Sequence, residues 1–113
     1  MNAQALHGHL DALLLAVLEQ GARHGYAIIE ALRERSGGTL DLPTGTIYPA
    51  LRRLERAGYV ASSWSTVKGR ERRTYQLTEA GRRALAGERA GWREFSATVG
   101  RFLGAAEPPA APV

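Results

Sequence analysis

The spacing of apolar residues changes along the chain, and this change limits the folds open to it. From residue 10 to about residue 56 apolar side chains recur every three or four positions, which is the period of helices with one buried face. From residue 59 to residue 78 the pattern becomes compatible with strands, and a glycine stands in the middle, as in a β-hairpin. A chain of 113 residues with 44% hydrophobic content can bury one modest core. We therefore expect one α+β, mainly α, domain.

Two helices are expected before residue 40. An apolar stripe marks the first, over residues 10–18, and consists of Leu10, Leu13, Leu14, Val17 and Leu18. The second covers about residues 25–35, with Ile28, Ile29 and Leu32 on its inner face. The sequence SGG at residues 36–38 ends it.

A third helix lies within GTIYPALRRLERAGYV, residues 45–60. Its inner side collects four apolar residues, Ile47, Ala50, Leu51 and Leu54. Its outer side collects Gly45, Pro49, Arg52, Arg53 and Arg56. Gly58 supplies the left-handed residue that closes the helix. The basic side is therefore expected to face outward.

Pro49 interrupts this helical pattern, because a proline inside a helix removes a backbone hydrogen bond. Asp41, Thr44 and Thr46 are the candidate caps. If Thr46 caps the helix, Pro49 is its third residue, and the missing N–H has no intrahelical partner anyway. If the helix begins earlier, the lost bond is to the carbonyl of Gly45 on the exposed side. Both alternatives place Pro49 near the N-terminus, where it stiffens the helix or is simply tolerated.

A hairpin and a long helix complete the pattern. Strands are expected at residues 59–66 and 72–78, and the turn between them, VKGRE, gives the hairpin a basic tip. Thr78 can cap a fourth helix over residues 79–104. An a/d seam, interrupted only by Glu88, runs along that helix through Leu85, Trp92, Phe95, Val99 and Phe102. A helix with such a seam is expected to pair with another, whereas residues 105–113, rich in alanine and proline, are expected to be disordered.

Three helices followed by a hairpin describe a winged helix-turn-helix over residues 1–78. In this fold the third helix enters the DNA major groove and the hairpin, the wing, reaches along the backbone. The charge distribution agrees: residues 45–85 hold nine basic and three acidic residues, while the remainder holds six basic and eight acidic residues. A solvated basic face without a partner is the alternative interpretation.

The sequence also argues against several classes of protein. It has no cysteine, which excludes disulfides and thiolate chemistry and is compatible with the cytoplasm. The run LDALLLAVL at residues 10–18 is too short to span a bilayer. His7 and His9 lack a third metal ligand, and no nucleophile has a neighbouring base, so we expect neither a metal site nor an enzyme. No cofactor is expected.

Three motifs resemble the PadR-like family of transcriptional regulators. They are HGYAIIEAL in the second helix, the stretch at residues 45–60, and RRTYQLTEAGRRAL in the wing and the helix after it, together with Trp92. Their order and spacing match over roughly residues 8–103. The resemblance implies a dimeric DNA-binding regulator, most often a repressor, which pairs through its C-terminal helix and responds to a small molecule. Many relatives have a capping serine where this chain has Pro43.

The predicted DNA contacts come from the third helix and the wing. In the helix they are Thr44, Gly45, Thr46, Tyr48, Pro49, Arg52 and Arg53, and Arg52 or Arg53 has the reach to contact either phosphate or guanine. In the wing they are Lys68, Arg70, Arg72 and Arg73, which suit phosphate. Tyr48 lies at the margin of the outer face and is alternatively half core. Arg56 alternatively offsets the helix dipole.

The resemblance also implies an effector site around Trp92 at the dimer interface. In some short members a tryptophan at this place stacks flat hydrophobic ligands, and the surrounding positions here are Asp11, Leu15, Ser96 and Val99. Packing alone is the simpler role for Trp92 on such a seam. The dimerisation residues are those of the seam, namely Leu85, Trp92, Phe95, Val99 and Phe102. A ligand-responsive homodimeric repressor of a palindromic operator is therefore favoured over a non-specific nucleic-acid-binding or protein-docking module.

Overall fold

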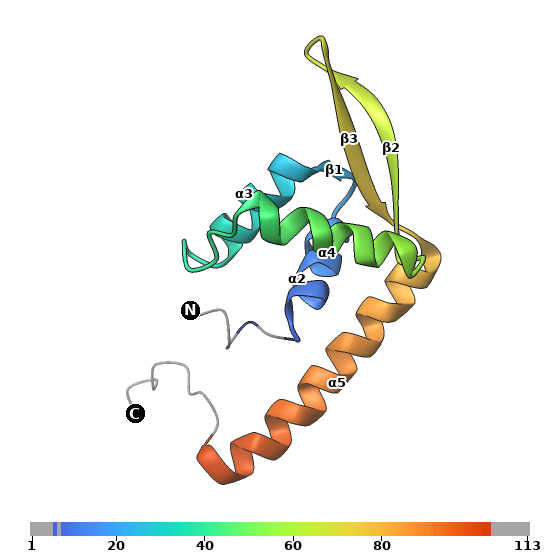
Figure 1. The fold of residues 1–113 in the computed structure, drawn as a ribbon. Coiled ribbons are helices and arrows are strands. Elements are labelled where there is room, and N and C mark those ends of the chain that lie inside the picture. The colour runs from blue at the N-terminus through green and yellow to red at the C-terminus, as the bar shows by residue number, and fades with distance from the viewer. Residues whose placement is uncertain (1–5, 7, 105–113) are drawn as a thin grey trace.

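The computed structural model describes residue 6 and residues 8–104, and within them it shows four helices and a three-stranded antiparallel sheet (Figure 1). In chain order the elements are α2 (Leu10–Leu18), β1 (Arg23–His24), α3 (Gly25–Arg35), α4 (Thr44–Arg56), β2 (Val60–Val67), β3 (Arg70–Leu77) and α5 (Glu79–Leu103). The predicted winged helix-turn-helix with a long C-terminal helix is thus confirmed. The tail at residues 105–113, predicted to be disordered, lies outside the described residues.

The predicted apolar stripes of the first three helices meet in one core. Leu14 of α2, Ile28 of α3 and Leu51 of α4 are each fully buried. Tyr75 and Leu77 of β3 cover this core on the side of the sheet, and α5 contributes one buried leucine from its second turn. The inner face of α4 thus packs against α2 and α3, and its outer face is left to solvent.

The start of α4 differs from the prediction. The helix begins at Thr44, and Pro43 occupies the N-cap position without a side-chain hydrogen bond, so the three predicted caps, Asp41, Thr44 and Thr46, are wrong. Pro43 has an extended backbone, and its carbonyl accepts the N–H groups of Thr46 and Ile47 at 3.0 and 3.2 Å. A proline can hold that backbone conformation without a capping side chain, since its φ is already fixed.

This start decides between the two interpretations of Pro49. Pro49 is the sixth residue of α4, so the absent bond is the one to the carbonyl of Gly45, as the earlier-start alternative predicted. Both residues are exposed, so water can reach the unpaired carbonyl. The proline therefore lies on the exposed side of α4 and leaves no buried polar group unsatisfied there.

The wing is a regular two-stranded ribbon with a tight turn. Val67 pairs with Arg70, and the two residues between them, Lys68 and Gly69, have φ angles of 52° and 77°. Two consecutive positive φ angles are characteristic of a type I′ turn, which suits the twist of a hairpin. The third strand, β1, was missed from the sequence. It pairs Arg23 with Tyr75 and is too short to show an alternating pattern.

Helix α5 continues well beyond the core. Thr78 caps it as predicted, because its Oγ1 accepts the N–H of Gly81 at 3.0 Å. The hairpin tip and the C-terminal end of α5 point away from the helices in opposite directions, and the molecule is 56 Å long and 27 Å wide (Figure 1). No helix in the described part of the chain is long and apolar enough to cross a membrane.

One ion pair joins α5 to the residue that caps the end of α2, and it makes the free energy of unfolding depend on pH. Arg89 donates two hydrogen bonds to the Glu19 carboxylate, at 2.6 and 2.7 Å, and these hold the pKa of Glu19 below its usual range. A carboxyl with a lowered pKa in the folded state stabilises the fold above its unfolded value of 4.5, and this contribution is lost as pH falls through the folded pKa.

We expect Glu19→Gln to remove this pH-dependent contribution. Melting temperatures measured between pH 3 and pH 7 should differ between wild type and variant above about pH 4.5, and converge as the pH falls below that value. The matched control is Glu30→Gln on α3, since Glu30 is exposed and has no ion pair within the described residues. A difference between wild type and Glu19→Gln that does not shrink as the pH falls below 4.5 contradicts the assignment.

Candidate nucleic-acid interface

The exposed end of α4 carries most of the predicted helix contacts. Thr44, Gly45, Pro49 and Arg52 are exposed, and Thr46 is partly buried. Because α4 begins at Thr44 and the N–H groups of Thr46 and Ile47 bond the Pro43 carbonyl, the N–H groups of Thr44 and Gly45 are the ones left without a carbonyl partner at this helix end. Hydroxyl groups and a glycine that allows close approach therefore share the accessible N-terminal end of α4, and Arg52 lies about two turns further along the same outer side.

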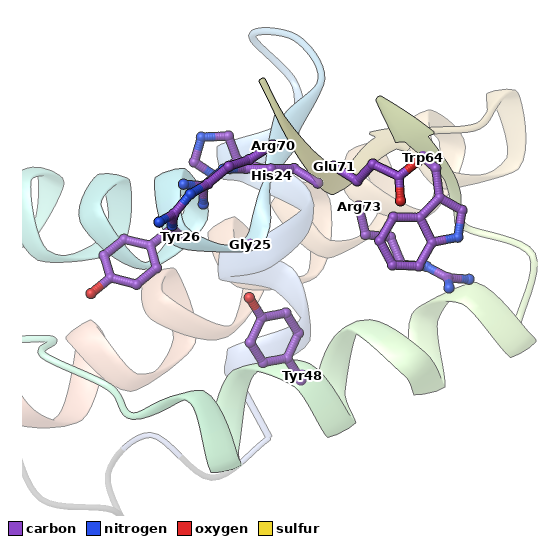
Figure 2. A pocket seen from close by; sticks show the side chains of 9 residues that line it. His24, Gly25, Tyr26, Tyr48, Trp64, Arg70, Glu71 and Arg73 are labelled. Atoms are coloured by element: carbon purple, nitrogen blue, oxygen red, sulfur yellow. The ribbon is translucent and has the colours of Figure 1, made fainter. Parts of the chain in front are cut away.

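Tyr48 is half core, as the alternative interpretation predicted. Its ring is partly buried and packs on the hydrophobic core. A Cβ atom on Gly25, the first residue of α3, would overlap this ring, so Gly25 is what makes room for it. His24 caps α3 by accepting the N–H of Ala27 on its Nδ1 atom at 3.2 Å. The phenol oxygen of Tyr48 thus points from α4 toward the N-terminus of α3 (Figure 2).

Arg53 is paired within the chain. Its guanidinium donates a 2.9 Å hydrogen bond to Asp11 Oδ1 on α2, and both side chains are about half exposed. The pair thus joins a predicted DNA contact to a predicted effector-site residue. Arg52 forms no such ion pair among the residues that the structure describes, so its guanidinium is available to a ligand.

The wing and the helices enclose a hollow of about 320 Å³ that opens to solvent (Figure 2). Tyr48 rises into it from α4, Tyr26 lies on the α3 side, and Trp64 and Arg73 lie together on the wing side. Its lining residues are His24, Gly25, Tyr26, Tyr48, Trp64, Arg70, Glu71, Arg72 and Arg73. Basic groups and aromatic faces are thus combined in one concave surface, a composition that suits a nucleic-acid backbone.

Five of the nine lining residues were not predicted as site residues: His24, Gly25, Tyr26, Trp64 and Glu71. Tyr26 and Trp64 leave 58% and 66% of their surfaces exposed. Single exposed aromatic side chains are common, but these two line the same hollow beside arginines, which marks a candidate contact surface. The sequence alone gave only a weak signal for them, because β1 was not expected and its pairing with β3 is what brings His24 and Tyr26 to the wing.

The four predicted wing cations differ in how they are held. Lys68 lies at the exposed turn, and Arg70 and Arg72 lie on β3 beside the hollow. Arg73 instead contacts Glu55, Ser62 and Trp64 of its own chain. Lys68, Arg70 and Arg72 are therefore the cations best placed to meet a phosphate backbone.

At the base of the wing, burial raises the pKa of the Tyr75 hydroxyl, so this group stays neutral at physiological pH.

The predicted seam on α5 divides into two parts. Leu85 is 3% exposed and belongs to the core of its own chain. Beyond it, Trp92, Phe95 and Phe102 leave 56%, 59% and 83% of their surfaces exposed, and Val99 is partly buried. The exposed part of the seam thus begins at Trp92.

The residues around Trp92 are only partly those predicted. The ring of His9 meets the Trp92 ring edge-on at 5.8 Å, and Ser96 donates a hydrogen bond to the Trp92 carbonyl at 2.5 Å. Leu15, by contrast, is 2% exposed and faces the core. His7 lies outside the described residues, and within them no cluster of three potential metal ligands occurs.

Comparison with known proteins gives consistent matches. The model of the transcriptional regulator PadR-like family matches residues 14–87. The transcriptional regulator Rv3488 of Mycobacterium tuberculosis is 37% identical over 78 residues, which cover 69% of this chain and 60% of that protein. A PadR family transcription regulator from Clostridium difficile is 32% identical with a TM-score of 0.75, covering 86% of this chain and 100% of that one. A transcriptional regulator from Clostridium thermocellum, 24% identical, has a TM-score of 0.81 over 88% of this chain and 98% of that chain, and supports the fold.

Proposed function

Because this chain belongs to the PadR-like family of transcriptional regulators, and is therefore a DNA-binding regulator and not an enzyme, we propose that it is a homodimeric repressor of a palindromic operator. The observation that carries this proposal is the exposed apolar seam of α5, from Trp92 to Phe102. A single chain leaves these side chains in water, whereas pairing with a second α5 buries them. A fixed dimer presents two α4 helices to two half-sites about one DNA turn apart.

In the proposed dimer each chain has two functional regions. Residues 1–78 form the DNA-binding domain and residues 79–104 the dimerisation helix. The N-terminal end of α4 enters the major groove, with Thr44, Gly45, Thr46, Tyr48 and Pro49 near the backbone and Arg52 reaching a base edge. Lys68, Arg70 and Arg72 hold phosphates from the wing.

The proposed effector is a flat, hydrophobic or aromatic molecule that stacks on Trp92. Its exposed ring and the partly exposed Val99 support this, and Ser96 and Asp11 add polar groups. Leu15, which is buried in the core, is not among the proposed effector contacts. An effector held between two α5 helices changes the separation of the two α4 helices, so that they no longer match both half-sites. We place this regulator in the cytoplasm, with the DNA that it controls.

The direct test is binding to a duplex carrying the inverted repeat upstream of the protein's own gene, titrated against a scrambled duplex of equal length. The mass of the protein in solution is measured in parallel. A dimer that prefers its own site by more than about a hundredfold supports the repressor. Equal affinity for both duplexes, or a monomer, favours instead a non-specific or protein-docking winged helix.

The two kinds of arginine should produce different defects. We expect Arg52→Ala to relax base preference, because a base contact is lost, at a cost of about 1–3 kcal/mol on the operator. Arg72→Ala should weaken all duplexes about equally and lower the slope of log affinity against log salt by about 1. Titrations of operator and scrambled duplex at several salt concentrations measure both effects. A uniform loss for both variants excludes base reading by Arg52.

A further inference from the structure

Glu55 is an acidic residue at the margin of the basic face of α4, and it contacts both strands of the wing. Its Oε2 accepts a hydrogen bond from the Ser62 hydroxyl at 2.5 Å and lies 3.5 Å from Arg73 Nη2. Arg73 Nε in turn donates to Ser62 Oγ at 2.9 Å. The Arg73 guanidinium lies over the Trp64 ring, 5.6 Å from its centroid. One carboxylate, one hydroxyl, one guanidinium and one indole ring thus form a closed network.

The strand register explains why these groups meet. Trp64 of β2 is directly opposite Arg73 of β3, and Ser62 is two residues before Trp64, so the three side chains share one face of the ribbon. This is the face that carries Tyr75 into the core, and next to the core it contacts Glu55 of α4. Glu55 follows the buried Leu54, which holds that turn of α4 against the base of the wing.

We propose that Glu55 is a positioning residue that fixes the angle between the wing and α4, and that Arg73 serves this network instead of holding DNA. The inference rests on the proposed DNA-binding function. Between Tyr75 and the tip, the ribbon has little apolar surface that could hold it in place apart from this network, because its side chains are mostly polar and exposed. A wing that is already at the right angle loses less conformational entropy on binding. The network also holds Trp64 as the wing-side wall of the hollow.

The charge of Glu55 and its contacts with the wing predict opposite effects on DNA binding when this residue is removed. A negative charge on a DNA-binding face repels phosphate, so electrostatics alone predicts that its removal strengthens binding. If Glu55 positions the wing, its removal lets Arg73 and the ribbon move, and binding weakens although the protein becomes more positive. The sign of the change therefore separates the two roles.

The experiment compares Glu55→Ala with Glu71→Ala on the same operator duplex and on a scrambled duplex. Glu71 is the matched control, because it is an exposed acid of the wing, beside the hollow, and has no ion pair among the described residues. We expect Glu71→Ala to tighten binding to both duplexes about two- to threefold. Glu55→Ala should instead weaken operator binding about tenfold, the cost of ordering a few released side chains.

Amide hydrogen exchange on the free protein provides a readout that does not need DNA. Glu55→Ala should speed exchange in residues 60–77 while leaving α2 and α3 at the wild-type rate, whereas Glu71→Ala should leave all these segments unchanged. Tighter DNA binding by both variants, or unchanged exchange in the wing of Glu55→Ala, overturns the positioning role. If wild type binds neither duplex, the proposed function fails, and the exchange result still decides whether Glu55 holds the wing.

Discussion

Gly81→Ala is expected to destabilise the fold by about 3 kcal/mol or more, because a Cβ atom at this position has no space. Gly81 lies in the first turn of α5, where the helix crosses the chain that enters β2. An added Cβ would overlap the carbonyl oxygen of Tyr59 and lie 3.1 Å from Leu77 Cδ2. The carbonyl cannot move freely, because it accepts the N–H of Thr78 at 3.1 Å. Relief of the clash thus breaks the junction between wing and α5.

The measurement is thermal unfolding of Gly81→Ala beside Gly87→Ala. Gly87 lies in the same helix, and a Cβ there meets no atom within 4 Å. Alanine at residue 87 should therefore stabilise the protein by up to about 1 kcal/mol through helix propensity alone. For a chain of this size the Gly81→Ala loss corresponds to a fall in melting temperature on the order of 15 °C. Equal melting temperatures for the two variants would show that the junction yields at little cost.

The helices and the wing were predictable because their signals are local. The stripes that place Leu14, Ile28 and Leu51 inward repeat at the helical period, and the alternation of Tyr75 and Leu77 fixes the inner face of β3. The N-terminal end of α4 was predictable only in part. A capping side chain was expected there, but the backbone of Pro43 begins the helix without one.

The pairing of the candidate site residues was not predictable, because it depends on contacts between distant parts of the chain. Asp11 and Arg53 were assigned to different sites, and only the packing of α2 on α4 brings them to 2.9 Å. Similarly, Glu55 is one acid in a basic stretch until the register of the hairpin places Arg73 beside it. Sequence patterns indicate which face a residue occupies, but not which charged group on another element it meets.

The exposed α5 seam has the largest consequence for DNA binding. Phe95 leaves 59% of its surface exposed, next to Trp92 at a ring distance of 6.1 Å. We expect Phe95→Glu to convert the proposed dimer into a monomer, because two carboxylates would be buried against each other at the symmetric contact. Loss of the second half-site should then lower operator affinity by more than about a hundredfold, since each domain binds alone.

Ala97→Glu is the control that separates dimer loss from added charge. Residue 97 lies two positions further along the same exposed helix, about 200° around its axis and so on nearly the opposite side from Phe95. Both variants introduce one glutamate in place of an uncharged residue, so non-specific repulsion of DNA affects them alike. Mass in solution and operator titration should distinguish them: Ala97→Glu stays dimeric and retains its affinity, whereas Phe95→Glu loses both. A dimeric Phe95→Glu would mean that α5 does not pair through this seam, and the two α4 helices would need another connection to read a palindrome.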